Sequence, residues 1–102
     1  MIVKKVGRAG GLESGDAMVT AEPNPQGGVQ VELESVLKTQ FGDSIVETAL
    51  RAARVMGVSD VSLSIVDRGA LDHVILSRVQ TAIYRAAQAD SFDWDKGEEG
   101  WK

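Results

Sequence analysis

Cysteine is absent from this sequence, so the chain can form no disulfide, present no thiolate nucleophile and bind no metal through thiolates. The absence is typical of proteins from a reducing compartment. Histidine is nearly absent as well, because His73 is the single histidine among 102 residues. One histidine without cysteine supplies too few ligands for a zinc site. The sequence therefore excludes thiol chemistry by the chain's own side chains and predicts no metal site.

An excess of positive charge and a long apolar run are also missing. The 11 Lys and Arg residues are outnumbered by 15 Asp and Glu residues, and the formal net charge is -4. Such a chain gains nothing from neutralising phosphates, and no apolar run approaches the roughly 20 residues of a membrane-spanning helix. The basic start, residues 1–6, leads into glycines, which is unlike a secretory signal. We expect a cytoplasmic protein without nucleic acid or membrane partners.

Catalytic motifs are sparse. A serine hydrolase needs a base beside its nucleophile, and Ser14, Asp72 and His73 supply the residue types. Asp72 and His73 are neighbours on an expected helix and cannot face each other, and Ser14 stands one place late for a G-x-S-x-G elbow. The early glycines match neither the dinucleotide-binding pattern nor the P-loop, and the acidic residues near the end lack the spacing of a calcium loop. We predict no catalytic residue.

A serine flanked by glycines stands near the start of the chain. Residues 12–16 read Leu-Glu-Ser-Gly-Asp, and Gly10 and Gly11 precede them. Glycine adopts backbone conformations that other residues adopt only at a cost, so this segment predicts an exposed turn with Ser14 on a mobile tip. By composition alone it is a common kind of loop.

Hydrophobic periodicity predicts three strands and two helices. Strands are expected at residues 17–22, 29–34 and 60–66, the first two as an antiparallel pair. The first helix is expected from a cap at Asp43 or Ser44, the latter with capping-box spacing to Glu47, to about Met56 with Gly57 as its stop. Gly42 interrupts the helical spacing of residues 35–42. The second helix is expected from about residues 70–72 to 88, with Leu71, Ile75, Val79, Ala82, Ile83 and Ala86 facing inward.

The order β-β-α-β-α predicts an α+β fold, a two-layer sandwich in which a small sheet of about three strands has both helices on one face. The strand order stays open. Residues 1–16 are expected to form a flexible arm that carries the serine loop, with an added edge strand as the alternative. Residues 17–88 form the single domain, and residues 89–102, with Trp94 and Trp101, form a flexible acidic tail.

Three short motifs carry a resemblance to a known family. Residues 12–16 (Leu-Glu-Ser-Gly-Asp), 40–43 (Gln-Phe-Gly-Asp) and 67–72 (Asp-Arg-Gly-Ala-Leu-Asp) together resemble the acyl carrier protein, or gamma subunit, of bacterial citrate lyase. The resemblance covers roughly residues 8–88 and leaves out the first residues and the tail. The related malonate decarboxylase carrier is a close second. The Asp-Ser-Leu motif of the four-helix fatty-acid carriers is absent.

The resemblance implies a non-catalytic carrier and phosphoprotein of citrate fermentation. In that family the serine at the position of Ser14 is joined by a phosphodiester to 2'-(5''-phosphoribosyl)-3'-dephospho-CoA, whose thiol carries acetyl and citryl thioesters. An alpha subunit exchanges acetyl for citrate, a beta subunit cleaves the citryl thioester to oxaloacetate, and a separate transferase attaches the group. The group would thus supply the thiol that the chain lacks.

Several readings stay open beside this one. Glu13, Gly15 and Asp16 are candidates for recognition by the transferase or the subunits. The Asp67-to-Asp72 motif is expected to fix the turn into the second helix, with a docking surface as the alternative. The rivals to the citrate lyase carrier are a malonate decarboxylase-type carrier, a non-covalent interaction or regulatory module, and a free-standing hydrolase.

Overall fold

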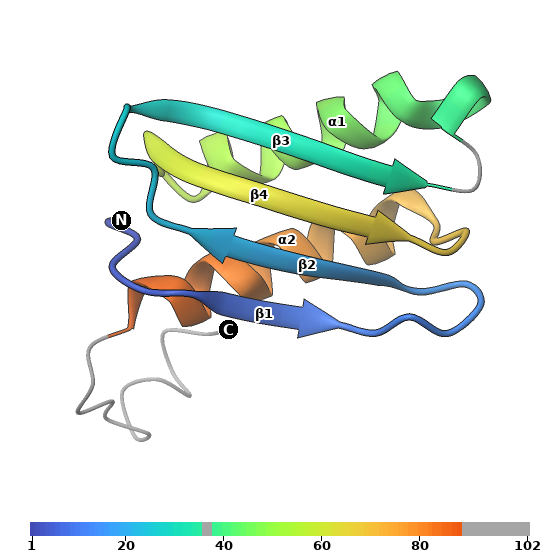
Figure 1. Ribbon diagram of the computed structural model, residues 1–102, viewed down its shortest axis with the longest axis horizontal. Coiled ribbons are helices and arrows are strands. Elements are labelled where there is room, and N and C mark those ends of the chain that lie inside the picture. Colours follow the sequence, from blue (N-terminus) through green and yellow to red (C-terminus); the bar gives the residue numbers. More distant parts are fainter. Residues whose placement is uncertain (36–37, 89–102) are drawn as a thin grey trace.

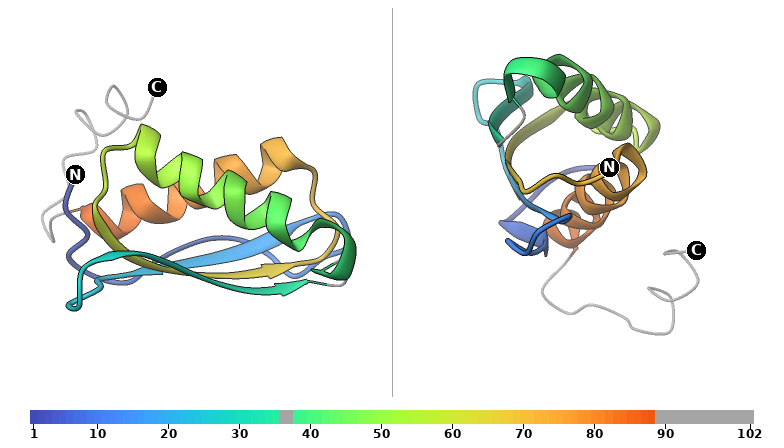
Figure 2. Two further views of the ribbon diagram at one scale, coloured as in Figure 1. Left: turned by 90° about the horizontal axis from the view of Figure 1, so that it is seen from above. Right: turned by 90° about the vertical axis from the view of Figure 1, so that its right-hand side faces the viewer.

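The computed structural model describes residues 1–35 and 38–88, and both helices lie on one face of a four-stranded sheet (Figure 1, Figure 2). In chain order the elements are β1 (Gly7–Gly10), β2 (Ala17–Glu22), β3 (Gly28–Ser35), α1 (Lys38–Val55), β4 (Asp60–Asp67) and α2 (Asp72–Ala87). The predicted α+β class and its two layers are confirmed. The predicted tail, residues 89–102 with Trp94 and Trp101, lies outside the described residues.

The strands follow the order β1-β2-β4-β3. β2 pairs antiparallel with β1 and with β4, and β3 pairs parallel with β4. The predicted antiparallel pairing of residues 17–22 with 29–34 is therefore wrong, because β4 lies between those strands. Val61, Leu63 and Ile65 of β4 are at most 1% exposed, whereas the apolar residues of β3 are half-buried. The two inner strands, β2 and β4, therefore carry the fully buried inward faces, where burial removes most apolar area from water, and β3 lies at the edge.

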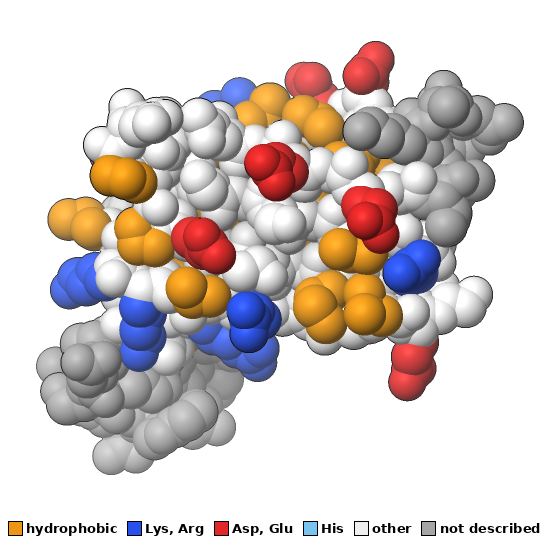
Figure 3. All heavy atoms as spheres, in the orientation of Figure 1, with side chains coloured by type: hydrophobic (Ala, Val, Ile, Leu, Met, Phe, Trp, Pro, Cys, Tyr) orange, Lys and Arg blue, Asp and Glu red, His pale blue; other side chains and the backbone are white. Residues whose placement is uncertain are grey.

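The sheet face away from the helices is uncovered within the described residues and mostly polar. Glu22, Glu32 and Glu34 alternate there with the inward residues of β2 and β3, and Figure 3 shows acidic side chains scattered over this face among small apolar areas. Ser62 and Ser64 of β4 lie on the same face. The inner face and the helix stripes together form the core.

The sheet has four strands where about three were predicted, and the additional strand is β1. It pairs with β2 from Gly7 opposite Ala21 to Gly10 opposite Met18. Gly7 lies so close to α2 that a Cβ there would collide with backbone atoms of Ala82 and Ala86. A strand of four residues with two glycines has too little periodicity to detect, so the edge-strand alternative for residues 1–16 is the one that the structure adopts.

Helix α1 begins at Lys38 and not at a cap on Asp43 or Ser44. Gly42 lies inside the helix, and the Ser44 carbonyl oxygen accepts a hydrogen bond from Thr48 Oγ1 at 2.9 Å, which places Ser44 in the helix interior. A glycine costs a helix only about 1 kcal/mol relative to alanine. Burial of the inward stripe outweighs that cost; the stripe consists of Ile45, Ala49, Ala52 and Ala53.

The two helices otherwise follow the prediction. The amide of Gly57 donates to the Arg54 carbonyl at 3.0 Å, and that of Val58 donates to the Ala53 carbonyl at 3.1 Å, which is the expected termination of α1 by glycine. The buried residues of α2 are Ile75, Val79, Ala82, Ile83 and Ala86. Leu71, predicted to face inward, is instead 66% exposed, because it precedes the helix in an extended conformation.

Candidate functional site

The loop that carries Ser14 connects β1 to β2 at one end of the sheet, beside the connection from β4 to α2 (Figure 1). The amide of Gly15 donates to the Arg68 carbonyl at 2.7 Å, and the amide of Arg68 donates to the Asp16 carbonyl at 2.9 Å. These reciprocal bonds extend the pairing of β2 with β4 beyond the last strand residues. The glycines predicted a mobile tip, whereas these two hydrogen bonds attach the loop to the connection between β4 and α2.

Ser14 occupies the apex of a tight turn. The amide of Asp16 donates to the Glu13 carbonyl at 3.0 Å, so Ser14 and Gly15 are the two central residues. Gly15 has a φ of 84°, which is the conformation that a type II turn requires at its third position. Ser14 is exposed and makes no hydrogen bond within the part of the chain that the structure describes. Its hydroxyl is therefore open to an approaching reagent.

The conformation of Gly15 leads to a stability prediction. Nothing lies within 4 Å of the position of a Cβ at Gly15, so a substitution there is strained only by its backbone. We expect Gly15→Ala to lower the free energy of unfolding by about 1 kcal/mol, and Gly15→Asn by less, because Asn tolerates positive φ better. Urea denaturation of the three proteins measures both values. An alanine variant as stable as the asparagine variant would contradict the turn assignment.

Asp16 joins the loop to α2 through Arg78. Arg78 Nε donates to Asp16 Oδ1 at 2.9 Å and Nη2 donates to Oδ2 at 3.1 Å, a two-point contact between residues 62 positions apart. The Asp16 and Arg78 side chains are 23% and 38% exposed. The hydrogen bond from Arg78, with a further bond from the amide of Ala17 at 2.7 Å, lowers the pKa of Asp16.

The lowered pKa has a consequence for stability and one for chemistry. The ion pair contributes fully above the unfolded pKa of Asp, about 3.9, and its contribution is lost as the pH falls through the lower folded pKa of Asp16. At neutral pH the pair is therefore intact. A carboxylate with a depressed pKa and both oxygens engaged is a poor general base, so Asp16 is unsuited to activating the neighbouring Ser14.

Asp67 organises the neighbouring connection. It is 1% exposed and accepts hydrogen bonds from the amides of Gly69 at 3.2 Å and Ala70 at 2.8 Å. It also accepts one from Ser35 Oγ, at the end of β3, at 2.8 Å. This supports the structural interpretation of the Asp67-to-Asp72 motif, because Asp67 fixes the turn on which Arg68 meets the Ser14 loop.

The residues weighed for catalysis are not assembled. Asp72 and His73 are exposed in the first turn of α2, and within residues 1–35 and 38–88 no hydrogen bond links either of them to Ser14. No group of three potential metal ligands occurs among the described residues. None of the described helices is long and apolar enough to cross a bilayer.

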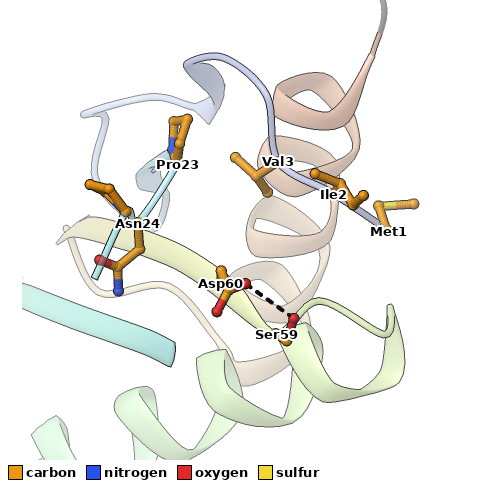
Figure 4. A pocket seen from close by; sticks show the side chains of 8 residues that line it. Met1, Ile2, Val3, Pro23, Asn24, Ser59 and Asp60 are labelled. Carbon is orange, nitrogen blue, oxygen red and sulfur yellow. Dashed lines mark hydrogen bonds between the residues drawn. The ribbon is translucent and has the colours of Figure 1, made fainter. Parts of the chain in front are cut away.

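Among the hollows of the described chain, three lie at the two ends of the molecule. One, of about 380 Å³, adjoins the Ser14 loop and is lined by Gly11, Glu13 and Arg78 among others. A second, shown in Figure 4, lies where the first residues of the chain pass Asn24 and Asp60. Its polar groups serve the fold, because Asn24 Nδ2 donates to the carbonyls of the following glycines and Asp60 accepts from the amide of Gly28. The third, of about 480 Å³, is lined by Met1, Tyr84 and Gln88 among others and lies away from Ser14. The hollow that adjoins the exposed Ser14 loop is the candidate site.

Sequence reasoning missed Arg78, and it included Arg68 only as part of the Asp67-to-Asp72 motif. Arg78 lies on the partly exposed side of α2, where a charged residue ordinarily needs no explanation. Only tertiary contact reveals that it meets Asp16. Of the residues predicted for recognition, Gly15 and Asp16 serve the shape of the turn, while Glu13 is exposed and makes no hydrogen bond through its side chain within the described residues.

The described residues form a small α+β domain with an exposed serine at the apex of a tight turn, and comparison with known proteins identifies its family. Residues 4–86 match the acyl carrier protein (ACP) family described as the malonate decarboxylase delta subunit. The citrate lyase acyl carrier protein of Fusobacterium nucleatum is 44% identical over 92 residues, covering 90% of this chain and 98% of that protein. That of Streptococcus mutans is 43% identical over 94 residues, covering 92% of each.

The chain belongs to the citrate lyase acyl carrier protein family, whose members are non-catalytic carrier subunits. The resemblance inferred from the three sequence motifs is thereby confirmed. A crystal structure of a Pseudomonas malonate decarboxylase hetero-tetramer in complex with malonate contains a chain of the same fold. The match has a TM-score of 0.59 at 20% identity and covers 81% of this chain and 89% of that one.

Proposed function

We propose that this chain is the acyl carrier subunit of a citrate lyase and that Ser14 is its attachment residue. Ser14 Oγ would be joined by a phosphodiester to 2'-(5''-phosphoribosyl)-3'-dephospho-CoA. The observation that carries the proposal is the exposed Ser14 hydroxyl, free of intramolecular hydrogen bonds in the described chain, at the apex of a tight turn. When bound, the group supplies a thiol that holds acetyl and citryl as thioesters.

The residues around Ser14 fit attachment by a separate enzyme. Asp16, the carboxylate held beside the turn, is occupied by Arg78 and is a poor base, so the chain does not activate its own serine. The sequence contains no cysteine, so a thiol must come from an attached group. Gly15 adds no side chain beside the hydroxyl, which leaves that side of Ser14 open.

The proposed partners are the alpha subunit, which exchanges acetyl for citrate, the beta subunit, which cleaves the citryl thioester to oxaloacetate, and the transferase that attaches the group. A tether raises the effective concentration of the acyl group at two active sites in turn. The names of the relatives support a role within a lyase, and the structural neighbour is one chain of a hetero-tetramer. The proposed location is the cytoplasm.

Mass spectrometry of the protein purified from its native host grown on citrate tests the proposal. We expect the intact mass to exceed the sequence mass by that of the group, and peptide mapping to place the addition on Ser14. Ser64, exposed on the open face of the sheet, is the internal control and should be unmodified. An active lyase complex whose carrier has an unmodified Ser14 would refute the proposal and favour a non-covalent module.

A malonate decarboxylase-type carrier is the second candidate, because the matching family description and the structural neighbour both name that enzyme. The same attachment to Ser14 is expected in both cases. The loaded complex distinguishes them by substrate: cleavage of citrate supports the first candidate, and decarboxylation of malonate supports the second.

A further inference from the structure

We infer that Arg78 is a positioning residue for the modification of Ser14: through its ion pair with Asp16 it holds the serine turn in the shape that a modifying enzyme recognises. This inference rests on the proposed attachment to Ser14. From the sequence, the attachment site lies entirely within residues 12–16. The inference adds Arg78 of α2, which is remote in the sequence, to the residues that the modification of Ser14 requires.

The contacts divide the loop into a held side and a presented side. On the held side, Asp16 meets the Arg78 guanidinium at two points and Gly15 donates to the Arg68 carbonyl. On the presented side, the side chains of Glu13 and Ser14 are exposed and make no hydrogen bond within the described residues. The held residues follow Ser14 directly, so their anchoring fixes the direction in which the turn projects the hydroxyl.

Arg78 is suited to this task because the helix backbone that carries it is rigid. The next residue, Val79, is fully buried in the core, so the α2 backbone at this point is fixed against the sheet. The planar guanidinium matches both oxygens of a carboxylate, whereas the ammonium of a lysine makes a single-point contact. The pair therefore restricts the orientation of Asp16 as well as its distance from the helix.

The ion pair is not needed for the fold as a whole. The Asp16 and Arg78 side chains are 23% and 38% exposed, and exposed pairs contribute little to global stability. The pairing of β1 with β2 and the core contacts of α2 do not involve the guanidinium. Loss of the pair should therefore loosen the turn and leave the domain folded, which separates a positioning role from a purely structural one.

The test uses Arg78→Met, which retains a long apolar stem without the charge, and Arg78→Lys, which retains the charge without the two-point geometry. The control is Arg51→Met, because Arg51 is exposed on α1 and makes no hydrogen bond or ion pair within the described residues. The first readout is kcat/KM for loading each apo-chain by the host's prosthetic-group transferase, followed as the gain in intact mass. The second is hydrogen exchange of the Gly15 and Arg68 amides at neutral pH.

We expect Arg78→Met to load about three- to tenfold more slowly and to exchange faster at both amides, with Arg78→Lys intermediate and Arg51→Met unchanged. The melting temperature should stay close to that of the wild type. Wild-type loading of Arg78→Met, with or without faster exchange, overturns the inference and leaves the proposed function standing. Slower loading without faster exchange also overturns it, because Arg78 would then act by direct contact with the transferase. A wild-type chain that the transferase does not load overturns both proposals.

Discussion

Ser14→Ala is expected to abolish covalent loading of the carrier and to reduce turnover of the assembled lyase to background. The substitution removes Ser14 Oγ, the oxygen through which the proposed phosphodiester joins the prosthetic group to the chain. The free energy of unfolding should change by less than about 0.5 kcal/mol, because the Ser14 side chain is exposed and makes no hydrogen bond within the described residues. Citrate cleavage by the complex and urea denaturation of the isolated chain measure the two effects.

Ser64→Ala is the matched control for this prediction, since Ser64 is also an exposed serine but lies on the open face of the sheet. It should be loaded and should support turnover as the wild type does. Activity retained by a complex containing Ser14→Ala would mean that the chain acts without a covalent arm, as an interaction or regulatory module. Loss of activity together with loss of folding would instead mean that the turn is needed for stability.

Asp67→Ala is expected to give the largest loss of stability among these substitutions, about 2–4 kcal/mol. The carboxyl group is 1% exposed and accepts from the amides of Gly69 and Ala70 and from Ser35 Oγ. Its removal leaves three partly buried donors without this acceptor. Thermal unfolding followed by circular dichroism should show a midpoint lowered by roughly 10 °C or more.

Asp60→Ala provides the comparison, because Asp60 begins the same strand at the opposite end of the molecule and is exposed. It accepts from the amide of Gly28 at 2.9 Å, a bond that water can replace, so a loss below about 1 kcal/mol is expected. Equal losses for the two variants would contradict the structural role assigned to Asp67. Asp67→Ala should also slow loading of Ser14, because Arg68, next to Asp67, is hydrogen-bonded to the serine loop.

The parts of the fold that depend on local hydrophobic periodicity could be predicted, and the parts that depend on packing between distant segments could not. The alternation of Val29, Val31 and Leu33 identifies a strand, because a half-buried sheet demands that period whatever its neighbours are. The same pattern says nothing about which strand lies next to it. β4 lies between β3 and β2, and both inner strands bury their inward faces more deeply than β3 does, a comparison between segments that no single window contains. The start of α1 was misplaced for a similar reason, since the cost of Gly42 is local and the gain from packing is not.

In the candidate site, too, some residues could be predicted from the sequence and others could not. Ser14 and the glycine after it could be chosen from composition and family motif, because a tight turn needs a residue that adopts positive φ. Arg78 could not be chosen, since its relation to Asp16 exists only after α2 has packed against the sheet. The turn at the Asp67-to-Asp72 motif was predicted, whereas the hydrogen bond between Asp67 and Ser35 of β3 was not.

The sequence by itself determined the two-layer α+β class, the absence of any cysteine thiol and the glycine-flanked serine at which we propose that a thiol-bearing group is attached. These properties depend on residue types and short-range periods, which are complete in the chain before it folds. Tertiary structure alone decided the strand order, the addition of β1 and the anchoring of the serine turn to α2 and to the β4–α2 connection. Each of these depends on surfaces that meet only when distant segments are packed together.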